Sequence, residues 1–111
     1  MGKYYILRGK RAFMTNDNEA WGRWFSMPEH QAERIVKQET IKGCRVSTVF
    51  LGIDHQFGNG RPLLFETIIF GGKHDDYQMR YSTWKQAEAG HQRAVKLVQG
   101  RKPTKKGKGK L

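Results

Sequence analysis

Two long apolar runs separated by a short polar segment constrain the fold of this chain more than any other feature of its sequence. The runs are Arg45–Ile53 (RVSTVFLGI) and Leu63–Phe70 (LLFETIIF), and a segment rich in glycine, residues 54–62, joins them. Neither run has the 3.6-residue spacing of an amphipathic helix, and both are rich in β-branched and aromatic residues. They predict two paired central strands, each covered on both faces.

Residues 28–41 allow two interpretations. A helix could begin at Pro28, or a strand could span Arg34–Ile41 and end in a Lys42-Gly43 turn. The strand is favoured because two β-branched residues close the segment and a Lys-Gly turn leads directly into the next strand.

A short helix is predicted over residues 17–26, after a run of candidate N-cap residues. Its aromatic residues Trp21, Trp24 and Phe25 stand at i, i+3 and i+4 and therefore share one helical face. We expect these three rings to pack on the core rather than to form a platform for bases.

A second helix is predicted over residues 83–99. Thr83 and Gln86 have the spacing of a capping box, and apolar residues follow at helical intervals with His91 among them. Gly100 ends the pattern. We interpret His91 as a hydrogen-bonded core residue rather than as a ligand.

These elements predict an α+β fold. With Tyr4–Leu7 and Gln78–Ser82 as further strands, the chain forms a mostly antiparallel sheet of about four strands, packed by an amphipathic C-terminal helix and a short N-terminal helix. Residues 1–99 form one domain, and residues 100–111 form a basic tail.

The charge balance favours a polyanionic partner. The 111-residue chain has a net charge of +11, and the tail carries six basic residues and no acid: Arg101, Lys102, Lys105, Lys106, Lys108 and Lys110. Lysines that alternate with glycines suit contact with phosphates without base recognition. Basic tails also occur as solubilising ends without a ligand. The aromatic residues expected to be exposed for stacking are Tyr4, Tyr5, Phe57, Tyr77 and Tyr81.

Other features of the sequence favour the cytoplasm. Cys44 is the only cysteine, so neither an internal disulfide nor a cysteine-based zinc site is expected. No stretch reaches the roughly 20 apolar residues of a membrane-spanning helix, and no secretory leader is recognisable at the first residues.

One acidic residue within the apolar runs is unusual. If Ile53 pairs with Leu63, Phe50 opposes Glu66, which then lies among core side chains and needs a partner. Arg61 or Arg80 could supply a structural ion pair, and contact with a ligand is the alternative. The candidate pocket consists of Asp54, His55, Arg61, Glu66 and Arg80.

The sequence gives little support for catalysis. Metal-dependent nucleases need a lysine two residues after the acid, and Ile68 stands there after Glu66. His55 and the His74–Asp76 group are expected at opposite ends of a strand, so they would not share a metal. Asp54 is interpreted as the cap of its own loop. We expect no catalytic residue, no metal and no cofactor, and therefore no enzyme.

Several segments resemble a group of small, mostly uncharacterised proteins of bacteriophages and prophages. The matching segments are VSTVFLGIDHQFG, PLLFETIIFGG and RYSTWKQAEAGH, with WGRWF as a weaker match, and the resemblance covers residues 18–98 without the tail. The resemblance implies a setting, namely a phage-encoded protein that acts in the cytoplasm of a bacterial host. It implies no mechanism.

These observations lead to a ranked expectation about function. The first is a phage accessory protein, not an enzyme, that binds nucleic acid without base specificity. The second is a host-directed inhibitor or anti-defence protein that binds a host protein, in which case a homodimer is possible. The third is a small-nucleotide binder or enzyme that uses the 54–62 loop.

Overall fold

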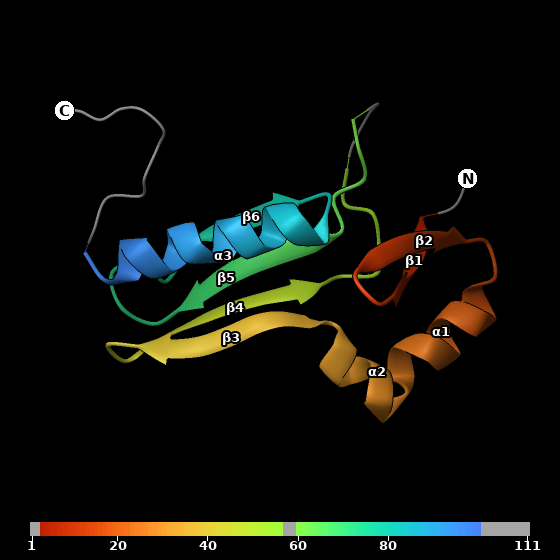
Figure 1. Ribbon diagram of the computed structural model, residues 1–111, viewed down its shortest axis with the longest axis horizontal. Helices are drawn as coiled ribbons and strands as arrows, with labels where there is room; N and C mark the ends of the chain where they lie inside the picture. Colours follow the sequence, from red (N-terminus) through yellow and green to blue (C-terminus); the bar gives the residue numbers. More distant parts are fainter. Residues whose placement is uncertain (1–2, 57–59, 101–111) are drawn as a thin grey trace.

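The computed structural model describes residues 3–56 and 60–100 and shows an α+β fold, as predicted (Figure 1). The chain begins with β1 (Tyr4–Arg8), β2 (Arg11–Thr15), α1 (Asn18–Ser26) and α2 (Pro28–Glu33). The main sheet follows with β3 (Ile35–Ile41), β4 (Cys44–Phe50), β5 (Phe65–Phe70) and β6 (Gln78–Tyr81), and α3 (Trp84–Val98) comes last.

The main sheet is a four-stranded antiparallel meander in the order β3-β4-β5-β6. The two apolar runs form β4 and β5, which are central as predicted. Lys42 and Gly43 connect β3 to β4 with φ angles of 52° and 79°. Two successive residues with positive φ are typical of the turn whose twist matches that of hairpin strands.

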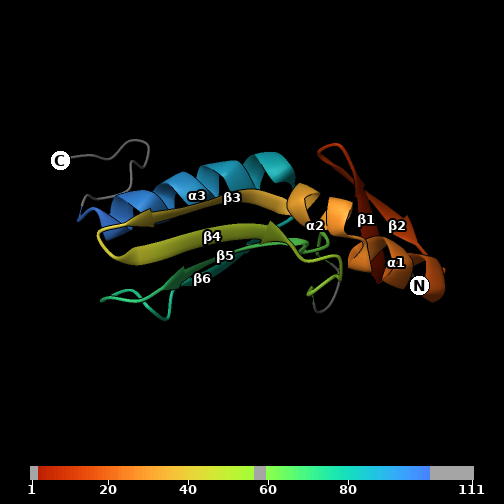
Figure 2. The ribbon, with the colours of Figure 1, turned by 90° about the horizontal axis from the view of Figure 1, so that it is seen from below.

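Helix α3 covers only one face of this sheet (Figures 1 and 2). Val46 and Phe50 on β4, and Phe65 and Ile69 on β5, point toward that side and are buried. Ala94 of α3 packs in the same cluster as Val46 and Ile69. No described helix lies along the opposite face, which we call the open face. The prediction that both faces are covered was therefore wrong. Antiparallel sheets often keep one solvated face.

An N-terminal hairpin of β1 and β2 stands apart from the main sheet. Strand β1 was predicted and β2 was not. The Tyr5 N–H donates to the Gly52 carbonyl at 2.8 Å, and Tyr4 forms an isolated bridge with Ile53. Leu7 is buried in the main core cluster. The end of the first apolar run thus leaves β4 and joins the hairpin.

Helix α1 begins after Asp17, whose side chain accepts a hydrogen bond from the Ala20 N–H. Its three aromatic side chains are only partly buried, so the expectation that they lie in the core holds in part. Trp21 stacks on Phe25 with ring centroids 4.8 Å apart, while Trp24 meets the buried core ring of Phe50 edge-on.

Each of the two interpretations of residues 28–41 is correct for part of the segment. Pro28 occupies the first turn of α2, where its missing N–H does no harm, and the strand follows as β3. At α3, the Thr83 hydroxyl caps the Gln86 N–H as predicted. The Gln86 side chain reaches back to the N–H of Ser82 rather than that of Thr83.

Candidate functional site

Glu66 forms an ion pair with Arg80 on the neighbouring strand. The two residues are opposite in the β5–β6 register, and Arg80 Nε lies 3.0 Å from Glu66 Oε2. The Gln78 side-chain amide donates to the same oxygen at 2.7 Å. The carboxylate therefore has a charged and a neutral donor, which agrees with the structural interpretation of this residue.

The environment of Glu66 differs from the predicted one. Val49, not Phe50, is its partner on β4, so the predicted register was wrong by one residue. A shift of one residue exchanges the two faces of a strand relative to its neighbour. Glu66 accordingly lies on the open face with Ser47 and Ile68 beside it, although its neighbours leave it only 8% exposed.

The other predicted pocket residues belong to the loop after β4. Asp54 Oδ1 accepts hydrogen bonds from the N–H groups of Gln56 at 2.8 Å and Leu63 at 3.0 Å, which confirms its role as a cap of its own loop. The His55 N–H donates to the Leu63 carbonyl, and the Arg61 carbonyl accepts from the Gln56 side chain. Among the described residues, the contacts join Glu66 to Arg80 and the loop residues to one another, and none joins the two groups.

A chain of polar side chains runs between α3 and the sheet, and the sequence analysis identified only His91 in it. The Tyr81 hydroxyl donates to Thr67 at 3.1 Å, and the hydroxyls of Thr67 and Thr48 lie 2.6 Å apart. Thr48 Oγ1 is 2.7 Å from His91 Nδ1, and His91 Nε2 is 2.7 Å from Glu39 Oε2. His91 is thus a hydrogen-bonded core residue, as predicted.

The hydrogen bonds of this series fit an arrangement in which all of them run in one direction. The carboxylate of Glu39 only accepts, so the imidazole carries a proton on Nε2. Tyr81 donates at the other end, and an arrangement in which each threonine hydroxyl accepts one bond and donates the next fits both ends. Nδ1 of His91 then accepts from Thr48. Every polar atom of the chain is satisfied in this arrangement, as its burial requires.

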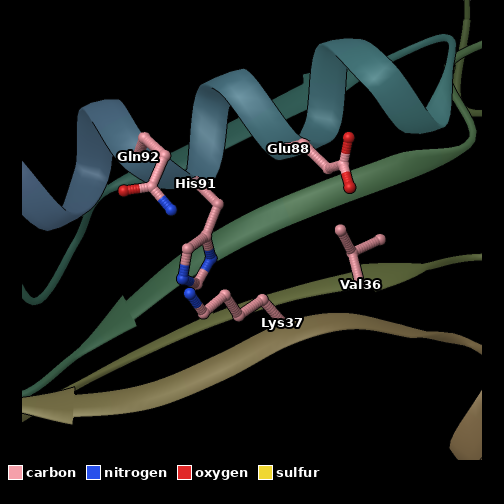
Figure 3. A pocket seen from close by; sticks show the side chains of 5 residues that line it. All are labelled: Val36, Lys37, Glu88, His91 and Gln92. Carbon is pink, nitrogen blue, oxygen red and sulfur yellow. The ribbon is translucent and has the colours of Figure 1, made fainter.

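A hollow of about 270 Å³ opens above this chain, lined by Val36, Lys37, Glu88, His91 and Gln92 (Figure 3). His91 is 1% exposed, and both of its ring nitrogens are already engaged. Thr48 has no exposed surface, so its hydroxyl cannot attack a substrate from the hollow. Thr48, His91 and Glu39 are joined by hydrogen bonds, and they therefore form a structural link here and not a nucleophilic triad. In the described ranges, His, Cys, Asp and Glu form no cluster suited to a metal ion.

Basic residues gather at the end of the sheet where α3 finishes. Figures 1 and 2 both show the β3–β4 turn, the β5–β6 loop and the C-terminal end of α3 at this end. Lys42 Nζ donates to the Gln99 carbonyl at 3.2 Å, which places Gly100 beside the turn. Arg45 and Lys73 are exposed here. The predicted nucleic-acid-binding residues of the tail lie outside the described residues.

Two acidic residues also stand at this end. Asp75 and Asp76 belong to the β5–β6 loop, and the Asp75 carboxylate accepts a hydrogen bond from the Gly71 N–H. Phe70 is exposed on the open face directly opposite Arg45. The sequence analysis missed this pair, because Phe70 was assigned to a strand covered on both sides.

Comparisons of the chain with protein-family models, with curated proteins and with solved structures give no significant match. The resemblance to phage proteins therefore stays a prediction. Of the helices within residues 3–56 and 60–100, none has the length and apolar character needed to cross a membrane.

Proposed function

We propose that this protein binds nucleic acid without base specificity and is not an enzyme. The observation that carries the proposal is the hydrogen bond from Lys42 to the carbonyl of Gln99. It places the start of the six-cation tail beside Lys42, Arg45 and Lys73. The tail therefore starts, at Gly100, at the same end of the molecule as these exposed cations.

Charge at one end suits contact with a phosphate backbone. Each Lys or Arg that neutralises a phosphate releases counterions, so affinity falls steeply with salt. The tail residues have a limited reach, because an extended chain spans at most about 3.5 Å per residue. They act within about 35 Å of Gly100, where the exposed cations of the body also lie.

The experiment that tests this proposal is the salt dependence of binding. Fluorescence anisotropy of a labelled 20-nucleotide DNA strand and of a 20-base-pair duplex is measured with the full-length protein between about 25 and 200 mM salt. The matched variant keeps the length of the tail and replaces its six basic residues by glutamine. We expect weaker binding and a salt slope shallower by up to about 4, at roughly 0.7 per lost phosphate contact on a single strand. No binding to either nucleic acid at low salt would reject the proposal.

The open face of the sheet favours a second candidate, a protein partner. Phe70 is exposed there, and so is Ile35, which stands opposite Val49 on the edge strand β3. Exposed apolar residues on a face and its edges are typical of contact surfaces. We propose a host bacterial protein or a second copy as the partner in this case. Light scattering of the purified protein, and stoichiometric capture of one host protein, test this alternative.

The bacterial cytoplasm and a phage origin belong to the same proposal. They rest on the sequence segments that resemble phage proteins and on the reduced state expected of a lone Cys44. The third expectation, a small-nucleotide site in the 54–62 loop, has less support, because Asp54 is engaged by backbone N–H groups of its own loop.

A further inference from the structure

The open face of the sheet carries an aromatic ring beside an arginine. Phe70 is 49% exposed, and it is the only exposed aromatic residue among residues 3–56 and 60–100. Of the predicted stacking candidates in the described part of the chain, Tyr81 is buried and the others are partly buried. Phe57 lies outside the described residues. Phe70 is thus the most exposed ring within the described part, and it was not one of those predicted.

Arg45 stands directly opposite Phe70 in the β4–β5 register and is also exposed. Opposed residues on one face of an antiparallel pair have Cβ atoms about 5 Å apart. The ring and the guanidinium therefore belong to one patch, with Thr40 of β3 next to Arg45 in the same row. Arg45 forms no ion pair with any described residue.

The charge of the open face is positive. Its one acidic side chain is that of Glu66, and Arg80 and Gln78 already bind this carboxylate. The cation left without a counter-charge is Arg45. Lys42 and Lys73 stand in the loops that border this end of the face. Asp75 and Asp76 also belong to the β5–β6 loop, and the Asp75 carboxylate is engaged by the Gly71 N–H.

We propose that this face binds single-stranded nucleic acid, with a base stacked on Phe70 and an adjacent phosphate held by Arg45. The inference rests on the proposed function and names its binding surface and the form of nucleic acid that it accepts. A base inside a duplex is stacked on both sides and offers no free face to a ring, whereas an unpaired base does. An aromatic ring beside basic groups is how proteins hold a single strand without reading its sequence.

The polar side chains around Phe70 agree with a nucleic-acid ligand. Ser47 and Gln38 of the next row are hydrogen-bonded to each other at 2.8 Å on the same face. A protein interface has a more apolar centre, whereas here Phe70 stands opposite Arg45, and the partly buried Ile68 stands between Ser47 and Gln78. The strand would pass from Phe70 and Arg45 toward the end where the tail begins.

Substitutions of Phe70 in the full-length protein test the inference by anisotropy with a labelled 20-nucleotide oligothymidine and a 20-base-pair duplex. Phe70→Leu keeps an apolar side chain without a ring, and Phe70→Trp keeps a ring. We expect Phe70→Leu to bind the single strand about fivefold or more weakly, while Phe70→Trp retains affinity. Duplex binding should change little in both. Met79→Ala is the matched control, because Met79 is 46% exposed but its register position opposite Thr67 places it on the other face.

Arg45→Gln provides a second, independent variant. We expect a shallower salt slope for the single strand, by about 0.7, since one phosphate contact is lost. Arg23→Gln is the control, because Arg23 is exposed and belongs to α1, which Figure 1 shows at the opposite end of the molecule from the β3–β4 turn. Thermal melting followed by circular dichroism establishes that each variant is folded.

The outcomes separate this inference from the proposed function. If the wild-type protein binds neither nucleic acid at low salt, both are rejected. If it binds and Phe70→Leu binds the single strand equally well, the inference is rejected and the proposed function stands. If Phe70→Leu instead converts a dimer into a monomer without changing binding, the face is an interface between two copies and the inference is rejected as well.

Discussion

The hydroxyl of Thr48 on β4 lies 2.7 Å from Nδ1 of His91 on α3, although the two residues are 43 positions apart. Thr48 also contacts the Thr67 hydroxyl of the neighbouring strand. One side chain therefore joins two strands and the helix that covers them. Because the contact is buried, each of its polar atoms depends on this partner for hydrogen bonding.

Replacing Thr48 by valine should destabilise the protein by about 1–3 kcal/mol. Valine has nearly the same shape but no hydroxyl, so His91 Nδ1 and the Thr67 hydroxyl lose a buried partner. Urea denaturation followed by circular dichroism measures the change. Thr40→Val is the control, because Thr40 is exposed on β3 and should tolerate the change with little effect. An equal response of both variants would contradict the role given to Thr48.

Tyr81 stands at the other end of the same series of hydrogen bonds, and its burial predicts that the stability of the protein depends on pH. Burial raises the pKa of Tyr81 above its ordinary value of 10.0. In the unfolded chain the phenol ionises at about pH 10, while in the folded protein it keeps its proton. The stabilising contribution is therefore complete below about pH 10 and is lost as the pH rises toward the folded-state pKa.

The stability of Tyr81→Phe should consequently fall less steeply with pH than that of the wild type above about pH 9.5. Urea denaturation at several pH values from 7 to 11 measures both slopes. At pH 7 the variant should already be less stable by about 1 kcal/mol, because it lacks the hydrogen bond to Thr67. Parallel curves for the two proteins above pH 9.5 would exclude the linkage to Tyr81.

Gly90 and Gly22 should respond in opposite ways to alanine, although both lie within helices. A Cβ atom added at Gly90 would overlap the ring of Tyr81, which packs directly under α3. A Cβ atom at Gly22 would meet nothing within 4 Å. We expect Gly90→Ala to destabilise the protein by about 1–3 kcal/mol and Gly22→Ala to stabilise it by about 0.5–1 kcal/mol. The midpoints of thermal unfolding test the pair, and stabilisation by both would contradict the close approach of α3.

The sequence predicted those elements whose patterns are local. The strands β4 and β5 were recognised from runs rich in β-branched and aromatic residues, and α3 was recognised from the helical spacing of its apolar residues. The strand β2 was missed because Arg11–Thr15 is short and mixed in polarity. Its position depends on pairing with β1, and no local pattern of residues indicates this pairing.

The prediction of the candidate site depended on the register between β4 and β5. That register is set by contacts between residues that are far apart in the sequence. Counting back from the 54–62 loop assumed that the first apolar run continues to Ile53. In the structure the chain turns at Gly52, whose φ is 80°, and its carbonyl accepts from Tyr5 of β1. The run therefore leaves the main sheet before its apolar residues end. The resulting shift of one residue moved Glu66 to the open face, and it kept Phe70 and the Thr48–Thr67 contact from being foreseen.

Asp54 provides a test of whether its side-chain oxygen caps the loop after β4. Asp54→Ala removes the acceptor for two backbone N–H groups and should destabilise the protein by about 1–2 kcal/mol. Asp54→Asn keeps a side-chain oxygen and should recover most of that loss. Chemical denaturation compares the two. Equal losses for both variants would indicate that the charge, and not the capping oxygen, is needed.

The ion pair between Glu66 and Arg80 should be modest in energy and sensitive to salt. Arg80 has 34% of its side chain exposed, so water and ions screen its attraction to the carboxylate. A double-mutant cycle with Glu66→Gln and Arg80→Gln should give a coupling of about 0.5–1 kcal/mol at low salt and less at 1 M salt. Gln78 is the internal reference, because it contacts the same oxygen without a charge. The Glu66–Gln78 coupling should therefore hardly change with salt, and an equal salt response of both couplings would contradict an electrostatic origin for the first.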